Sequence, residues 1–180
     1  MRHLLIAVAA AALVANSAFA QGAQDPQTTY KTVGAKAGPP AATIAYGAAA
    51  QQVADLRKPA GKGPFPVAVV IHGGCWRSDF DNRLSMSAFA EALCKRGFAT
   101  WNIEYRRLGD QGGGWPGTFE DVAGAIDKLA GVAAEHQLDL SRVVIVGHSS
   151  GAHLALCAAS LAAARALVED RSQTGQRCGD

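Results

Sequence analysis

The sequence lacks an excess of charge of either sign. It carries 17 lysines and arginines against 15 aspartates and glutamates, and the basic residues form no stripe. No ladder of aromatic residues is interleaved with them, which argues against a nucleic-acid partner. After residue 20, no apolar run approaches the length of about 20 residues that spans a bilayer, so the sequence argues against a membrane partner as well.

Cysteine is scarce too, with four residues at positions 75, 94, 157 and 178. They form no C-x-x-C pair or other metal-ligand spacing, so we expect no metal site. Cys94 and Cys157 lie in apolar helical patterns and are expected to be buried thiols. An oxidising compartment would permit disulfides, whose connectivity the sequence does not determine, and the sequence gives no indication of oligomeric state.

The first 20 residues are typical of a targeting segment. Residues 1–3 are a short basic start, residues 4–14 are a continuous apolar run, and residues 17–20 supply an A-x-A cleavage site. This pattern is that of a Sec-type signal peptide, which is too short for a membrane anchor. We therefore expect cleavage after Ala20, export to the periplasm or the outside, and a single domain in the remainder.

Alternating strand and helix patterns organise the rest of the chain. Residues 21–40 are predicted to form a flexible leader and residues 166–180 a polar tail, on either side of a domain over 41–165. Within that domain, strands are predicted near 43–46, 52–57, 66–72, 98–105 and 142–146, and helices near 83–96, 118–137 and 152–159. Thr118 is the expected N-cap of the second helix, with Asp121 in the capping-box position. The alternation predicts an α/β fold, with a parallel sheet covered by helices on both faces.

The most informative motif is the G-x-S-x-G pentapeptide of residues 147–151, whose serine is Ser149. It follows a predicted strand and precedes a predicted helix. A serine on such a sharp turn projects its hydroxyl above the sheet, and the glycines permit close crowding there. Ser149 is therefore the candidate nucleophile, with an unreactive turn serine as the plainer alternative.

A nucleophilic serine needs a base to take its proton and donors to hold the oxyanion. Candidate donors follow the strongest predicted strand, where His72, Gly73, Gly74, Cys75 and Trp76 occur in succession. The two adjacent glycines allow main-chain N–H groups to point into a shared space. The N–H that follows the nucleophile, that of residue 150, is the expected partner. A simple strand-end turn is the plainer alternative.

Three motifs occur in order: HGGCW at 72–76, YRR at 105–107 with GGWPGTFEDV at 113–122, and GHSSGAHLAL at 147–156. Together they resemble the α/β-hydrolase superfamily, and within it the feruloyl-esterase-like and kynurenine-formamidase-like branch. The resemblance covers about residues 45–161. It implies an α/β-hydrolase fold, no cofactor, and catalysis by a serine, an acid, a histidine and a main-chain oxyanion hole. Carried over, it makes Ser149 the nucleophile and Gly74, Cys75 and Ser150 the oxyanion donors.

The chain departs from this family after the nucleophile. The family order is serine, acid, histidine, whereas residues 150–180 contain three acids and the single histidine His153. His153 belongs to the elbow helix, where we expect it to pack, and His72, His136 and His148 stand in positions that do not suit the catalytic base. We infer a truncated or frame-shifted hydrolase whose sheet is incomplete at the C-terminal end. This would leave the apolar edge of the last strand unpaired.

Two further groups of residues have candidate roles. Arg106 or Arg107 is expected to pair with Asp121 as part of the scaffold, with a substrate contact as the alternative. Trp76 and Trp115 are candidates for the wall of an acyl or aromatic pocket. Loop anchoring by burial is the equally weighted alternative for both tryptophans.

The sequence therefore predicts an exported serine hydrolase of carboxylic esters that forms an acyl-enzyme on Ser149. The acid and the histidine would come from a longer gene product. An amide, formamide or peptide substrate is the alternative within the same fold, since the same machinery serves both. A non-catalytic fragment or a binding module is the alternative from another class, and it is the favoured interpretation of the 180 residues by themselves.

Overall fold

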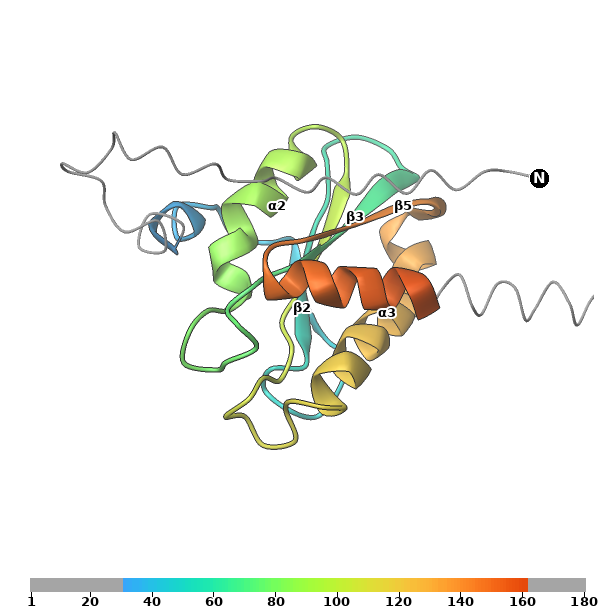
Figure 1. Ribbon diagram of the computed structural model, residues 1–180. Helices are drawn as coiled ribbons and strands as arrows, with labels where there is room; N and C mark the ends of the chain where they lie inside the picture. Colours follow the sequence, from blue (N-terminus) through green and yellow to red (C-terminus); the bar gives the residue numbers. More distant parts are fainter. Residues whose placement is uncertain (1–30, 162–180) are drawn as a thin grey trace, which may run out of the picture.

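A computed structural model describes residues 31–161, and its centre is a five-stranded sheet (Figure 1). The strands are β1 (Ala42–Ala45), β2 (Val53–Arg57), β3 (Phe65–Ile71), β4 (Ala99–Ile103) and β5 (Leu138–Gly147), in the spatial order β1-β2-β4-β3-β5. Strands β3, β4 and β5 run parallel, as predicted. Strands β1 and β2 pair antiparallel, and β2 is antiparallel to β4, so the sheet is mixed. The short connection between β1 and β2 accounts for the antiparallel pairing of these two strands, because only antiparallel neighbours can be joined by a tight turn.

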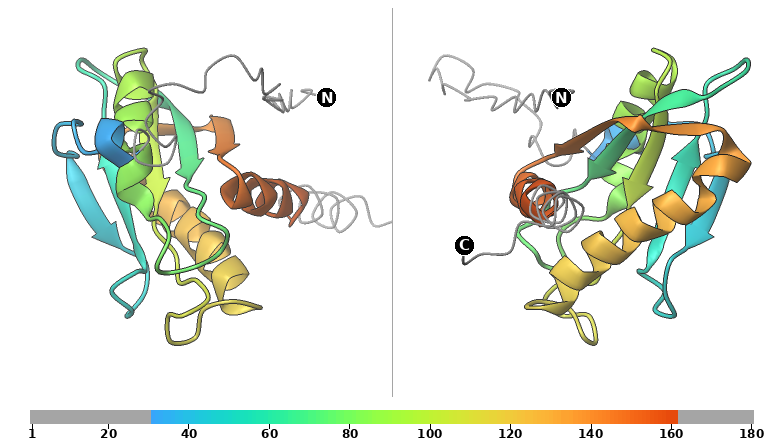
Figure 2. Two further views of the ribbon diagram at one scale, coloured as in Figure 1. Left: turned by 60° about the vertical axis from the view of Figure 1, so that its left-hand side comes forward. Right: turned by 90° about the vertical axis from the view of Figure 1, so that its right-hand side faces the viewer.

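Helices cover both faces of this sheet, which confirms the predicted α/β fold. A short 3₁₀ turn, η1 (Arg83–Met86), leads into α2 (Ser87–Cys94), and α3 (Gly117–His136) precedes β5. A last helix covers residues 150–161, which we call the elbow helix. Figures 1 and 2 show α2 on one side of the sheet and both α3 and the elbow helix on the other.

Strand β3 is the centre of the core because both of its faces are apolar. Val67, Val69 and Ile71 point to the face that α3 and the elbow helix cover. Val70 points the other way and packs with Met86 and Ala90. Alternate side chains of a strand project to opposite faces, so a strand buried on both sides must be apolar throughout.

Two predicted helix starts are corrected by the structure. The helix expected over 83–96 is divided, because Asn82 caps a 3₁₀ turn before α2 begins at Ser87. Thr118 is not an N-cap, since Pro116 occupies that position and α3 begins at Gly117. The Thr118 hydroxyl accepts from the Gly114 amide instead and donates to a main-chain oxygen of the preceding loop.

The cysteines differ in part from expectation, and the structure describes the second half of the predicted leader. Cys94 and Cys157, predicted to be buried, are half-buried, and Cys75 is exposed; all three are free thiols. Residues 31–34 form a helical turn, and Arg57 donates to the carbonyl oxygens of Gly38 and Pro39. The predicted signal peptide, residues 21–30, the fourth cysteine and the polar tail lie outside the described residues.

Strand β5 lies at one edge of the sheet. Among residues 31–161 it pairs only with β3, and Val144 within it is 42% exposed. This agrees with the expectation of an unpaired apolar edge. No helix within the same residues is long and apolar enough to cross a membrane.

Candidate active site

The pentapeptide forms a sharp turn between β5 and the elbow helix. Ser149 stands at its apex with φ of 52°, in the left-handed region, and is exposed. The amide of His148 donates to Ile71 O over 3.1 Å, and the amide of Gly151 donates to His148 O over 2.8 Å. These bonds hold the apex against the end of β3.

The two flanking glycines are required because a side chain at either position would clash with main-chain atoms. A Cβ on Gly147 would lie 2.2 Å from Gly151 O, and a Cβ on Gly151 would lie 2.3 Å from both Ile71 O and His72 O. Real Cβ atoms do not approach main-chain oxygens so closely, and main chain at the end of a buried strand cannot move aside. The G-x-S-x-G spacing is therefore a packing requirement of the strand-to-helix turn.

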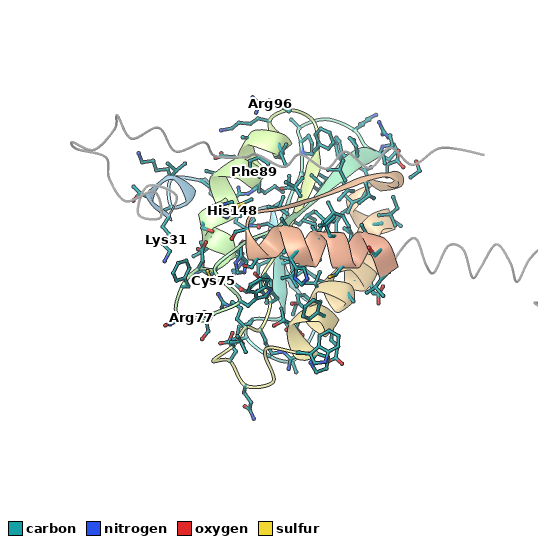
Figure 3. All side chains as sticks on the ribbon, viewed as in Figure 1. Lys31, Cys75, Arg77, Phe89, Arg96 and His148 are labelled. Carbon is teal, nitrogen blue, oxygen red and sulfur yellow. The ribbon has the colours of Figure 1, made fainter. Side chains whose placement is uncertain are left out.

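The turn that follows β3 lies directly against Ser149. A Cβ on Gly73 would lie 2.7 Å from His148 O and 3.2 Å from the Ser149 Cβ. Figure 3 labels Cys75 and His148, which lie at the same end of the elbow helix. The structure thus brings together two motifs that are about seventy residues apart in the sequence.

The backbone after Gly73 turns through three successive left-handed residues. Gly74 has φ of 111°, Cys75 of 52° and Trp76 of 58°. Among the described residues, the amides of Gly74, Cys75 and Ser150 donate to no protein acceptor. Free main-chain N–H groups beside an exposed hydroxyl are what an oxyanion hole requires. The geometry leaves the three predicted donors available for this role.

An aromatic group lines one side of the elbow. The ring of His153 contacts Trp76 edge-on with centroids 5.6 Å apart, and it contacts Phe119 in the same way at 5.7 Å. Phe119 in turn contacts Trp115 at 5.0 Å. The two predicted pocket tryptophans do not contact each other, but His153 and Phe119 join them. Trp115 is 81% exposed and Trp76 is 36% exposed, so burial does not anchor Trp115 and the loop-anchoring alternative fails for it.

Asp121 forms the predicted ion pair, with Arg106. The guanidinium donates to both carboxylate oxygens, over 2.8 and 2.7 Å, and the Arg106 amide adds a third bond of 2.9 Å. Because Asp121 is only 2% exposed, this pair fixes the loop before α3 and belongs to the scaffold. Arg107 approaches Glu104 and Asp110 instead, each at 3.4 Å.

Glu104 is the residue that sequence reasoning missed. Its carboxylate, 3% exposed, accepts from His72 Nε2 over 2.9 Å and from the Arg83 amide over 3.0 Å. Burial alone would raise the pKa of Glu104, but the His72 hydrogen bond, the charges of His72 and Arg107, and the Arg83 amide bring the pKa below its ordinary value. An acidic residue within the predicted strand 98–105 was the available signal.

Two of the histidines have partners other than the candidate nucleophile. His72 is fully buried against Glu104, and His153 Nε2 lies 3.7 Å from Cys157 Sγ on the same helix. No group of three or more metal-ligating side chains occurs among residues 31–161. A cavity of about 610 Å³ opens between residues 31–40 and 78–87, but none of the predicted site residues lines it.

Comparison with known proteins is consistent with this geometry. The BD-FAE family model matches residues 54–178. A probable isoprenylcysteine α-carbonyl methylesterase of Arabidopsis thaliana is 28% identical over 116 residues, which are 64% of this chain and 24% of that protein.

Solved esterase structures are similar as well. Esterase B from Lactobacillus rhamnosis is 26% identical with a TM-score of 0.61, over 71% of this chain and 42% of that one. A bifunctional GH43-CE protein of Bacteroides eggerthii is 32% identical with a TM-score of 0.56, over 62% of this chain and 16% of that one. The chain spans about a quarter of the curated relative and less than half of these solved structures. It belongs to the BD-FAE family, and its fold is of the α/β-hydrolase type shared by these esterases.

Proposed function

We propose that this protein is a carboxylic ester hydrolase in which Ser149 is the nucleophile. The observation that carries the proposal is the placement of an exposed, left-handed Ser149 against the glycine turn after β3, beside three unbonded amides. The relatives named above are esterases, which favours an ester over an amide substrate.

In the proposed reaction, Ser149 Oγ attacks the ester carbonyl carbon and its proton passes to a general base. The carbonyl oxygen becomes an oxyanion, held by the amides of Gly74, Cys75 and Ser150. The oxyanion collapses, the alcohol leaves with a proton, and an acyl group remains on Ser149. Water then attacks this acyl-enzyme, releasing the carboxylic acid and returning the proton to Oγ.

The proposal leaves the general base and its acid partner unassigned, because residues 162–180 contain no histidine and because His72 and His153 contact other groups. A serine with donors but no base reacts slowly with esters. Once acylated, it also lacks a base to activate water, so the acyl-enzyme persists. Trp76 and Trp115, joined through His153 and Phe119, would line the acyl side of the site. The N-terminal segment would export the protein to the periplasm or the outside after cleavage following Ala20.

The test is the reaction of the 180-residue chain with p-nitrophenyl acetate and with a fluorophosphonate, each with and without imidazole as a substitute base. We expect an acetyl or phosphonyl adduct on Ser149, found by peptide mass spectrometry and formed faster with imidazole. Ser149→Ala should abolish it. Ser160→Ala is the matched control, since that hydroxyl only bonds Leu156 O one turn earlier on the elbow helix. An adduct that survives in Ser149→Ala, or no adduct on a folded chain with imidazole present, would refute the proposal.

A further inference from the structure

One buried carboxylate holds both ends of the loop between β3 and η1. Glu104 Oε1 accepts from His72 Nε2 over 2.9 Å at the start of the loop, and Oε2 accepts from the Arg83 amide over 3.0 Å at its end. Between these anchors lie Gly74 and Cys75, the candidate oxyanion donors. The loop could not shift at either end without breaking a bond to Glu104.

The His72 ring faces a hydrogen-bond acceptor on each side. Nδ1 lies 2.7 Å from Gly73 O, and Nε2 lies 2.9 Å from the Glu104 carboxylate. A neutral imidazole has a single N–H and can donate to only one of these oxygens, whereas an imidazolium donates to both. An imidazolium beside an ionised Glu104 donates to both oxygens, within a ring that is 0% exposed. The two contacts fit a protonated His72.

The groups around His72 and Glu104 balance this charge. The Tyr105 ring stacks on the imidazole with centroids 4.3 Å apart, and its hydroxyl donates to His72 O over 2.8 Å. Arg107 lies 3.4 Å from Glu104 Oε1 and, on its other side, 3.4 Å from Asp110.

The adjoining loop and the elbow complete the surroundings. Arg107 also donates to the Asp81 carbonyl oxygen. The Arg83 side chain is paired with Asp55 at 2.9 Å, and His148 lies on the far side of Gly73. Glu104 is thus the acidic partner of both His72 and Arg107, and Arg107 is shared with Asp110.

We propose that Glu104 is a positioning residue, which holds His72 as an imidazolium and so fixes the direction of the Gly74 and Cys75 amides beside Ser149. The Gly73 carbonyl is the link, because it accepts from the protonated Nδ1 and the next amide in the chain is that of Gly74. The effect of Glu104 on catalysis rests on the proposed function. Its effects on the protonation of His72 and on the geometry of the loop are independent of that function.

The decisive variant is Glu104→Gln, which keeps the size of the side chain and one acceptor oxygen but removes the charge. Asp55→Asn is the matched control, since both carboxylates are 3% exposed and both bind Arg83, one through its amide and the other through its side chain. Nitrogen-15 spectra of the histidine rings report protonation directly, with the His72 signals assigned by their absence in His72→Gln.

At pH 7 we expect two protonated His72 nitrogens in the wild type and in Asp55→Asn, and one in Glu104→Gln. A single protonated nitrogen in the wild type, or the same protonation in wild type and Glu104→Gln, would overturn the proposal. The wild-type spectrum alone decides this if Glu104→Gln does not fold.

Fluorophosphonate labelling in imidazole tests the effect on the site. Loss of one oxyanion donor typically costs about 10²–10³-fold in rate. We expect Glu104→Gln, which misdirects donors without deleting them, to label about 10- to 100-fold more slowly than the wild type, and Asp55→Asn to label within about threefold of it. Equal slowing in both variants would mean a general structural role and would overturn the proposal. If the wild type itself does not label, the proposed function fails, and the ring spectra still decide the positioning role.

Discussion

The left-handed backbone of Ser149 predicts that the protein is more stable with glycine at this position than with alanine. An L-residue in this region costs roughly 1–2 kcal/mol relative to the right-handed conformation, whereas glycine adopts it freely. Ser149 has φ of 52°, and among residues 31–161 its exposed hydroxyl has no hydrogen-bond partner that the replacement would remove. The serine is therefore retained at a cost to folding.

The size of the effect follows from two opposing contributions. Relief of the left-handed conformation favours glycine by about 1–2 kcal/mol, and the greater freedom of glycine in the unfolded chain opposes this by about 0.4–1 kcal/mol. We expect Ser149→Gly to be more stable than Ser149→Ala by about 0.5–1 kcal/mol. For a domain of this size that is a difference in Tm of about 1–4 °C. Neither variant should form the Ser149 adduct.

Urea and thermal unfolding followed by circular dichroism would measure this difference. The control is the same pair of substitutions at Ser160, which is exposed within the elbow helix. There the sign should reverse, with glycine about 1 kcal/mol less stable than alanine. If Ser149→Gly is no more stable than Ser149→Ala, the nucleophile does not occupy a strained backbone and the reasoning is wrong.

Three further predictions concern packing and charge. Gly151→Ala should lower the free energy of unfolding by more than about 2 kcal/mol in urea melts, since its Cβ would meet two main-chain oxygens at the carboxyl end of β3. Gly131→Ala in α3 is the control. A Cβ at that position meets nothing within 4 Å, so this substitution should raise the free energy of unfolding by about 1 kcal/mol. The pKa of Asp139, lowered to about 2 chiefly by the Ser141 hydroxyl, should rise in Ser141→Ala when followed by NMR titration. Because the pKa of folded Glu104 lies below its ordinary value, its contribution to stability should be complete above about pH 4.5 and fall as the pH drops further. The difference in Tm between wild type and Glu104→Gln should shrink accordingly, and a constant difference down to pH 2 would contradict this.

Local patterns allowed most of the fold to be predicted from the sequence. Strand β3 and the parallel arrangement of β3, β4 and β5 follow from apolar runs that alternate with helical spacing. Helix beginnings were predicted less well, because they depend on partners distant in the sequence. Asp121 occupies the position of a capping-box acid, yet it binds Arg106 across the loop instead.

The candidate site, like the fold, could be predicted from the sequence only in part. The nucleophile and the glycine turn could be located from sequence, because a strand, a tight turn and a helix are specified by neighbouring residues. The aromatic residues that line one side of the elbow could be predicted only in part. Trp76 and Trp115 were identified as loop aromatics, but Phe119 and His153, which join them, lie on helices where an apolar spacing also predicts ordinary core residues.

The sequence by itself determined the elbow, the glycine turn and the class of fold, because each depends on short-range requirements for glycine, β-branched residues and helix formers. Only the tertiary structure decided that Glu104 would hold both ends of the loop that carries Gly74 and Cys75. The contact between Glu104 and His72 joins residues 32 positions apart at the ends of neighbouring strands, and no local pattern encodes it. A buried carboxylate acquires its role from the groups that the sheet brings around it, and those groups are adjacent only after folding.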